Sequence, residues 1–218
     1  MAAMTFPGCA YMGVNEKKQE DTYMATIITV SNQKGGVGKT TTTAALAAGL
    51  SMEGKRVLCI DLDPQGNLGF CLGLDAEAGY TVLDALKGQI PVREAIRQTQ
   101  LCGLLSSDIT LSSTGLELVR GQRRESILRD TLQPVLGEYD YVVIDTPPAL
   151  NLLTVNAYAV SDYLVIPMAS DILSLVGLSQ LKETVESVQS QLNPRLKVLG
   201  ILLTRFNGRT CLARDVLE

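Results

Sequence analysis

The sequence of 218 residues contains no histidine. This absence excludes imidazole both as a general acid or base and as a metal ligand. An enzyme with this sequence therefore has to work through positioning and electrostatics, which is largely how phosphoryl transfer is catalysed.

Cysteine is also sparse, and its five positions form no C-x-x-C pair: Cys9, Cys59, Cys71, Cys102 and Cys211. An odd number of scattered cysteines supports neither a zinc site nor a redox motif. Reduced thiols suit a cytosolic protein, so we expect a cytoplasmic location. Cys59 stands inside an apolar stretch and is expected to be a small core residue.

The chain has no basic excess and no long apolar run. Its 19 Lys and Arg residues against 23 Asp and Glu residues give a net charge of −4, which is no global signal for nucleic acid. One local concentration comprises Arg120, Arg123, Arg124 and Arg129; it is typical of a solvated helix face, and DNA contact is the alternative. No segment reaches the ~20 apolar residues that a membrane span requires.

The most informative segment present is the run from Ser31 to Thr42, which contains K-G-G-V-G-K-T. An apolar stretch precedes it, and an Ala/Leu-rich stretch follows. A strand, a glycine loop and a helix N-terminus in this order form a phosphate cradle, because backbone N–H groups and the helix dipole converge there. A plain turn would explain neither the lysines nor the threonines. The residues expected around a nucleotide are Lys34, Gly35, Gly36, Val37, Gly38, Lys39, Thr40 and Thr41.

Two residues of this loop have specific expected roles. Lys39 would reach the β- and γ-phosphates, and the Thr40 hydroxyl would ligate Mg²⁺. The strict G-x-x-x-x-G-K-[ST] pattern fails, because Gln33 replaces its first glycine and Lys34 adds a second lysine.

The form K-G-G-x-G-K-[ST] resembles the deviant Walker A loop of the ParA/MinD ATPase family. The resemblance implies ATP and Mg²⁺ as ligands. It also implies a homodimer formed on ATP, in which Lys34 crosses the interface to the nucleotide of the other subunit.

Two acidic motifs follow where this resemblance expects them. The string D-L-D-P-Q-G-N begins at Asp61 after an apolar strand and is similar to the family's switch I motif. Asp63 would then position the attacking water, and Asp61 would assist through the magnesium shell. Asp145 ends the apolar run from Tyr141 and resembles a Walker B acid that holds Mg²⁺ through water, opposite Thr40. The alternative for Asp61 is a strand-terminal carboxylate that caps the next turn.

The remaining pattern predicts an α/β fold, with a doubly wound, mostly parallel sheet and helices on both faces. We expect a strand over 163–167 ended by Pro167, a helix over 173–191 and a strand over 196–204. Two short helices are expected within 81–98, the second opened by Pro91, together with a strand over 101–106 and helices over 114–119 and 126–136. Family members read adenine near the loop after residue 204, so Asn207 is a candidate base contact, and a plain Asn-Gly turn is the alternative.

Domain limits complete the expectations. Residues 24–218 should form one P-loop ATPase domain, and residues 1–23 a disordered extension, since Met24 begins the first strand as family proteins often begin. ParA-like proteins continue further past residue 210, so the resemblance implies a shortened C-terminal segment that lacks part of the relatives' DNA-binding surface.

The functional interpretation is a ParA-type partitioning ATPase for DNA segregation. Its implied partners are a ParB-like centromere-binding protein and non-specific DNA, with association to the nucleoid. The alternatives are a MinD-like positioning ATPase and a nucleotide-binding scaffold with little turnover. The D-L-D-P-Q-G-N string favours ParA.

Overall fold

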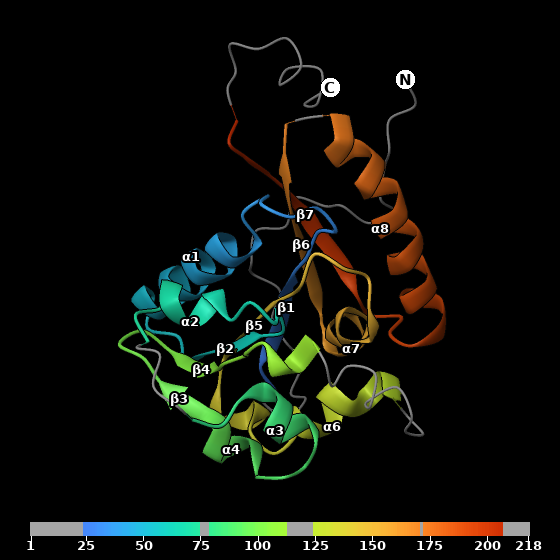
Figure 1. Cartoon of the computed structure of the whole chain (residues 1–218). Coiled ribbons are helices and arrows are strands. Elements are labelled where there is room, and N and C mark those ends of the chain that lie inside the picture. The colour runs from blue at the N-terminus through green and yellow to red at the C-terminus, as the bar shows by residue number, and fades with distance from the viewer. Residues whose placement is uncertain (1–23, 75–78, 113–123, 171, 207–218) are drawn as a thin grey trace.

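A mostly parallel sheet organises the protein (Figure 1). The computed structural model describes residues 24–74, 79–112, 124–170 and 172–206. Within these residues the sheet has seven strands: β1 (Thr26–Val30), β2 (Val57–Asp61), β3 (Ile96–Gln98), β4 (Gly103–Leu105), β5 (Tyr141–Asp145), β6 (Tyr163–Ala169) and β7 (Lys197–Thr204). Their spatial order is β3-β4-β2-β5-β1-β6-β7, and β3 runs antiparallel to β4 while the other neighbours are parallel.

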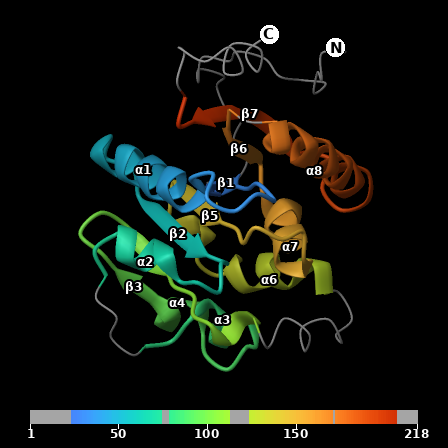
Figure 2. The same cartoon turned by 45° about the horizontal axis from the view of Figure 1, so that its top comes forward.

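The helices cover both faces of this sheet (Figure 2). One face carries α1 (Lys39–Met52) and α2 (Asn67–Cys71). The other carries α3 (Val82–Leu86), α4 (Val92–Ala95), α6 (Ile127–Leu132), α7 (Leu152–Val160) and α8 (Ile172–Gln191). Short 3₁₀ turns, η1 (Arg124–Ser126) and η2 (Leu136–Glu138), flank α6. The predicted doubly wound α/β fold is confirmed.

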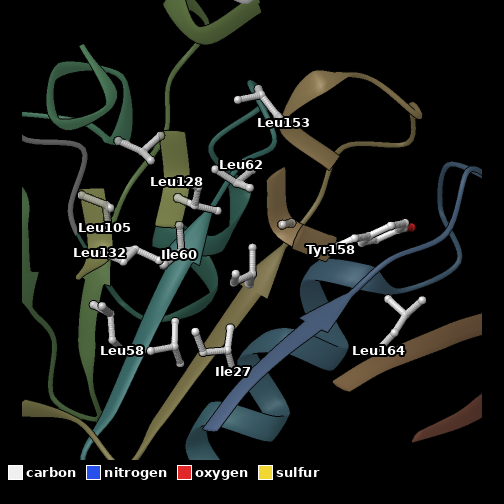
Figure 3. Close-up of a cluster of buried hydrophobic side chains, with 14 of the residues drawn as sticks. Ile27, Leu58, Ile60, Leu62, Leu105, Leu128, Leu132, Leu153, Tyr158 and Leu164 are labelled. Carbon is white, nitrogen blue, oxygen red and sulfur yellow. The ribbon is translucent and has the colours of Figure 1, made fainter. Parts of the chain in front are cut away.

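Strand β2 shows why the sequence folds this way. Its five residues are all buried. Leu58 and Ile60 pack into the core beneath α6 and α7, whereas Val57 and Cys59 pack toward α1. Both sheet faces are therefore apolar, which is why the parallel strands read as continuous apolar runs rather than alternating ones. Figure 3 shows the larger of the two cores, with side chains from β1, β2, α6 and α7 meeting on one side of the sheet.

Several element predictions are confirmed. The two short helices within 81–98 are α3 and α4, and Pro91 is the N-cap of α4. The strands expected over 101–106 and 196–204 are β4 and β7, and the long helix over 173–191 is α8. Cys59 is fully buried, as expected. Its Sγ lies 3.7 Å from that of Cys102, so two cysteines far apart in the sequence meet in the fold as free thiols.

The prediction that Pro167 ends its strand is wrong, because β6 continues to Ala169. The Pro167 carbonyl accepts a hydrogen bond from Asn32 Nδ2 at 2.8 Å. In a strand, the C=O and N–H of one residue point to the same side. An N–H at position 167 would therefore point toward β1, which has already ended at Val30. A proline is tolerated in a strand where no ladder donor is required.

Two further differences concern short elements. The helix expected over 126–136 stops at Leu132, because Pro134 has no N–H with which to continue the helical hydrogen bonds. Ile96–Gln98 forms the antiparallel strand β3 instead of extending α4. The expectations for residues 1–23, 114–119 and 207–218 lie outside the described residues. None of the described helices has the length and apolarity needed to cross a membrane.

The core of β2 supports a stability prediction. Leu58→Ala should lower the free energy of unfolding by about 2–5 kcal/mol, because it leaves a cavity among closely packed side chains. The measurement is urea denaturation followed by circular dichroism. Leu199→Ala, at a strand position that is 54% exposed, is the matched control and should cost about 0.5 kcal/mol or less. Equal losses in the two variants would contradict the assignment of Leu58 to the core.

Candidate nucleotide site

Three neighbouring strands end in register at one edge of the sheet. Val30 of β1 pairs with Asp145 of β5, and Asp145 pairs with Asp61 of β2. The glycine loop leaves β1 at the same edge. The carboxyl edge of a parallel sheet is where such folds bind ligands. The fold thus brings together three segments that are far apart in the sequence.

The loop after β1 has a conformation that requires its glycines. Gly36 and Gly38 have φ angles of +71° and +88°, which disfavour residues with a side chain. A Cβ added to Gly35 or Gly36 would meet no atom within 4 Å, so open space adjoins the loop. The cradle has room for a ligand beside its backbone.

Helix α1 begins directly from this loop and leaves its N-terminus available. Its N-cap is Gly38, which has no capping side chain, and its first turn contains no acidic residue. The first N–H groups of a helix have no partner within the helix, and they carry the positive end of its dipole. This terminus is therefore suited to an anion.

Lys39 stands at the base of the cradle and is buried. Its Nζ donates to the Lys34 carbonyl oxygen at 3.1 Å. Burial lowers the pKa of Lys39, while the charges of Asp145 and Asp63 act in the opposite direction. The ammonium thus lies within electrostatic reach of both carboxylates.

Asp145 is a buried carboxylate with one unsatisfied oxygen. Its Oδ1 lies 3.5 Å from the Thr43 hydroxyl, which has the Lys39 carbonyl oxygen as a closer acceptor at 3.1 Å. A hydrogen bond from the Thr40 side chain favours the ionised form of Asp145. Its Oδ2 is buried without a hydrogen-bond partner. Burial raises the pKa of Asp145 to about 6.

Asp61 lies beside it on the next strand and is fully buried. Its two oxygens accept from the backbone N–H of Asp63 at 2.9 Å and of Leu68 at 3.1 Å. Burial, followed by the charge of Asp145, raises its pKa to about 7. The Asp61 carboxylate therefore caps the following turn, which was the alternative role expected from the sequence. It also lies beside Asp145 on the neighbouring strand.

The residues present fit a magnesium ion. Asp145 Oδ2 is an unpaired buried oxygen beside hydroxyl groups, and two adjacent buried carboxylates favour a cation. Among the described residues, no three His, Cys, Asp or Glu side chains gather closely enough to hold a metal alone. Mg²⁺ typically takes only one or two protein carboxylates and completes its shell with waters and substrate phosphates.

Asp63 is half-buried at the rim of the site. Its Oδ1 accepts from the Gln65 backbone N–H at 3.0 Å, and its carbonyl accepts from Gly66 N–H at 3.0 Å. This turn packs closely against the segment after β4, because a Cβ on Gly66 would lie 2.8 Å from the Ser107 carbonyl oxygen. The turn that carries Asp63 therefore has little freedom to move toward β4.

Four residues that the sequence analysis did not single out hold the site together. Asn32 Oδ1 accepts from Lys34 N–H at 2.9 Å, the Tyr158 hydroxyl donates to Ser31 Oγ at 2.7 Å, and Thr43 contacts Asp145. Figure 3 shows the Tyr158 hydroxyl turned toward the segment that continues β1. Thr204 Oγ1 donates to the Val37 carbonyl oxygen at 2.9 Å. Only Thr43 carried a sequence signal, since it follows Lys39 by one helical turn.

The structure brings together the loop residues 34–41, Asp61, Asp63 and Asp145. Asn207 lies outside the described residues. A strand, a glycine loop with a buried lysine, a helix N-terminus and two acidic strand ends define the class of P-loop nucleotide-binding proteins.

Comparisons with known proteins identify the family. A family model described as an AAA domain matches residues 25–198. The chain is 47% identical over 195 residues to the chromosome partitioning protein ParA of Myxococcus xanthus (strain DK1622), covering 88% of this chain and 69% of that protein. It is 44% identical over 197 residues to the chromosome partitioning protein ParA of Caulobacter vibrioides (strain NA1000 / CB15N), covering 88% and 74%.

A solved structure has the same fold as this chain. Cobyrinic acid a,c-diamide synthase from Mycobacterium smegmatis with bound ADP and magnesium matches with a TM-score of 0.85 and 39% identity. The match covers 89% of this chain and 80% of that one. The chain belongs to the ParA/MinD family of partitioning ATPases.

The close approach at Gly66 supports one prediction. Gly66→Ala should lower the free energy of unfolding by about 1–3 kcal/mol more than Gly54→Ala, because the new methyl group meets the Ser107 backbone. Gly54 is the matched control: its φ is +75°, close to the +65° of Gly66, and its Cβ position is open. Urea denaturation of both variants measures the difference. Losses of the same size would show that only the left-handed backbone matters.

The buried carboxylates support a second prediction. Asp61 and Asp145 have raised pKa values of about 7 and about 6, so between about pH 4 and pH 7 the folded protein binds more protons than the unfolded chain. Stability without magnesium should therefore fall as the pH rises through this range. Urea denaturation in EDTA at about pH 5 and about pH 7.5 tests this. Asp140, whose pKa is lowered to about 2, titrates below that window, and the Cys102 thiol, whose pKa is lowered to about 7, opposes the two carboxylates only near its upper end. Stability that rises toward pH 7.5 would contradict the raised pKa values.

Proposed function

We propose that this protein binds Mg²⁺-ATP, dimerises in that state and hydrolyses ATP, and that the cycle switches its binding to DNA and to a protein partner during DNA segregation. The observation that carries the proposal is the buried Lys39 beside Asp145, whose Oδ2 has no partner, at the foot of an open glycine loop. A nucleoside triphosphate would supply phosphate oxygens for Lys39, and its metal ion would supply a cation for Asp145 Oδ2. The solved neighbour named above is also described with a bound ATP analogue and magnesium.

Each residue of the site has a role in this proposal. Backbone N–H groups of residues 35–41 hold the phosphates, and Lys39 exchanges its contact with the Lys34 carbonyl for the β- and γ-phosphate oxygens. Thr40 and Asp145 hold the magnesium ion, and Asp61 supports it from the neighbouring strand. The ion supplies charge neutralisation at the phosphates.

The half-buried Asp63 is the residue that we assign to the attacking water. It lies at the rim of the site, close enough for its charge to act on both Lys39 and Asp145. Its carboxylate can accept a proton from water or orient it toward the γ-phosphate. Lys34 completes the nucleotide site of the other subunit, which explains why a loop that already contains Lys39 has a second lysine.

The proposed partners are those implied by membership of the family, and the contacts of two arginines bear on where DNA would bind. A ParB-like centromere-binding protein, DNA and a second copy of the chain are proposed. In the described part of the arginine cluster, Arg124 pairs with Glu125 at 2.8 Å and Arg129 donates to the Ala159 carbonyl. Arg124 and Arg129 already have partners within the protein, so these two arginines are poor candidates for the main DNA contact.

Two other functions compete with partitioning. The solved neighbour is named as a diamide synthase. The two relatives of higher identity are both named as chromosome partitioning proteins, which favours partitioning. A scaffold without turnover is disfavoured because the lysine and all three carboxylates of an ATPase site are present at the sheet edge.

The test combines phosphate release with sedimentation velocity for the wild type and for Lys39→Ala, Asp63→Ala and Lys34→Ala. The wild type should release phosphate from Mg²⁺-ATP, and Lys39→Ala should reduce the rate about a hundredfold or more. Asp63→Ala should bind ATP, fail to hydrolyse it and accumulate as a dimer. Lys34→Ala should bind ATP as a monomer, because its lysine acts across the interface.

The outcomes separate the parts of the proposal. If the wild type released phosphate no faster than Lys39→Ala, the protein would be a nucleotide-binding scaffold and not an ATPase. An Asp63→Ala protein that binds ATP and remains monomeric would exclude the dimer switch. A Lys34→Ala protein that dimerises and hydrolyses normally would show that this lysine acts within its own subunit or not at all.

A further inference from the structure

The glycine loop forms hydrogen bonds with the ends of two strands, β6 and β7, that lie outside the glycine-loop sequence motif. Strand β6 lies beside β1, and β7 lies beyond β6 at the edge of the sheet. Asn32, at the start of the loop, donates to the Pro167 carbonyl oxygen of β6 at 2.8 Å. Thr204, the last residue of β7, donates to the Val37 carbonyl oxygen at 2.9 Å. The loop is therefore held across the ends of both strands.

The bond from Thr204 fixes one particular peptide group. A trans peptide is planar, so its C=O and N–H point in opposite directions. Because the Val37 carbonyl faces Thr204, the N–H of Gly38 points away from β7. That N–H belongs to the loop segment that leads into Lys39 and helix α1.

This peptide needs an external constraint. Gly38 has a φ of +88° and no side chain to restrict its backbone, so the preceding peptide can rotate at little steric cost. A rotated peptide would aim the carbonyl oxygen of Val37, instead of an N–H, at an anion in the loop. Carbonyl oxygen repels phosphate, so this single rotation would turn an attractive contact into a repulsive one.

Thr204 is well placed to prevent the rotation. It pairs with Ala169 in the β6–β7 ladder, which holds its backbone. Its methyl carbon lies 3.6 Å from the position that a Cβ on Gly38 would occupy, so the side chain also packs against the loop. A hydroxyl has one hydrogen, and the Met168 carbonyl, at 3.4 Å, is the longer alternative acceptor. The shorter contact is the one to Val37.

We propose that Thr204 is a positioning residue for nucleotide binding: its hydroxyl holds the peptide between Val37 and Gly38 with the N–H directed to the phosphates. This inference rests on the proposed function, since it presumes that the loop binds a nucleotide. It also makes the affinity for phosphate depend on the end of β7, two strands away from β1. Arg205 follows with a φ of 52°, the only positive value among the described non-glycine residues, so the chain turns out of the sheet directly after this contact.

The test compares Thr204→Val, which keeps the shape and removes the hydroxyl, with Thr204→Ser, which keeps the hydroxyl and removes the methyl group. Fluorescence titration with Mg²⁺ and a methylanthraniloyl derivative of ADP gives the dissociation constants. Thr204→Val should bind about five- to tenfold more weakly than the wild type, the effect of one lost hydrogen bond. Thr204→Ser should stay within about twofold of the wild type, since the hydroxyl bond remains. Equal affinity of Thr204→Val and the wild type, or equal losses in both variants, would overturn the proposal.

A second measurement separates this inference from the proposed function. Amide hydrogen exchange of residues 35–39 in the nucleotide-free protein should be faster in Thr204→Val than in Thr204→Ser and the wild type. This difference should appear although all three proteins unfold at similar urea concentrations. If the wild type bound no nucleotide, the proposed function would fail, and the exchange rates would still show whether Thr204 holds the peptide. Unchanged exchange in Thr204→Val would overturn the positioning role by itself.

Discussion

The burial of two like-charged carboxylates at adjacent strand ends is the constraint on which the rest of this structure depends. Asp61 and Asp145 are register partners on β2 and β5, and both are almost completely inaccessible. Ionised carboxylates in such a position repel each other and lose hydration, which costs the folded state free energy. A protein selected for stability alone would place apolar residues there. Their presence indicates a cationic ligand that compensates the charges when it is bound.

The surrounding contacts limit this cost without removing it. Two backbone N–H groups donate to Asp61, and the Thr40 side chain forms a hydrogen bond with Asp145, yet the pKa values of both acids remain raised. The remaining oxygen of Asp145 has no partner. Buried polar atoms without a partner are rare in folded proteins and are found at functional sites, where a bound ligand supplies the partner. The positive charge of the nearby Lys39 favours the ionised form of Asp145, but burial outweighs it and the pKa of Asp145 remains raised. The Lys39 Nζ itself donates to the Lys34 carbonyl oxygen.

The sequence allowed the fold class, the glycine loop and the three acids to be predicted, because each depends on local order. Apolar runs followed by Asp61 and Asp145 place both acids at one edge of any parallel sheet, whatever the details of packing. Two of the predictions that failed depend on neighbours distant in the sequence. Pro167 remains within β6 only because β1 ends beside it, and Ile96–Gln98 becomes a strand because β4 offers it an edge. Asn32 and Thr204 could not be assigned to the site, since the acceptors of their hydrogen bonds become neighbours only through the order of the strands.

The same order of strands makes the site a point of contact between both flanks of the sheet. On one side, the turn that carries Asp63 is held against the Ser107 backbone after β4. On the other side, the glycine loop is held by β6 and β7 through Asn32 and Thr204. A ligand that shifts the loop or the turn therefore acts on contacts with the segment after β4 on one side of the site and with β6 and β7 on the other. Under the proposed function, a nucleotide-dependent change in partner binding would use these contacts, since the residues beside the phosphate site are already attached to strands on both flanks of the sheet.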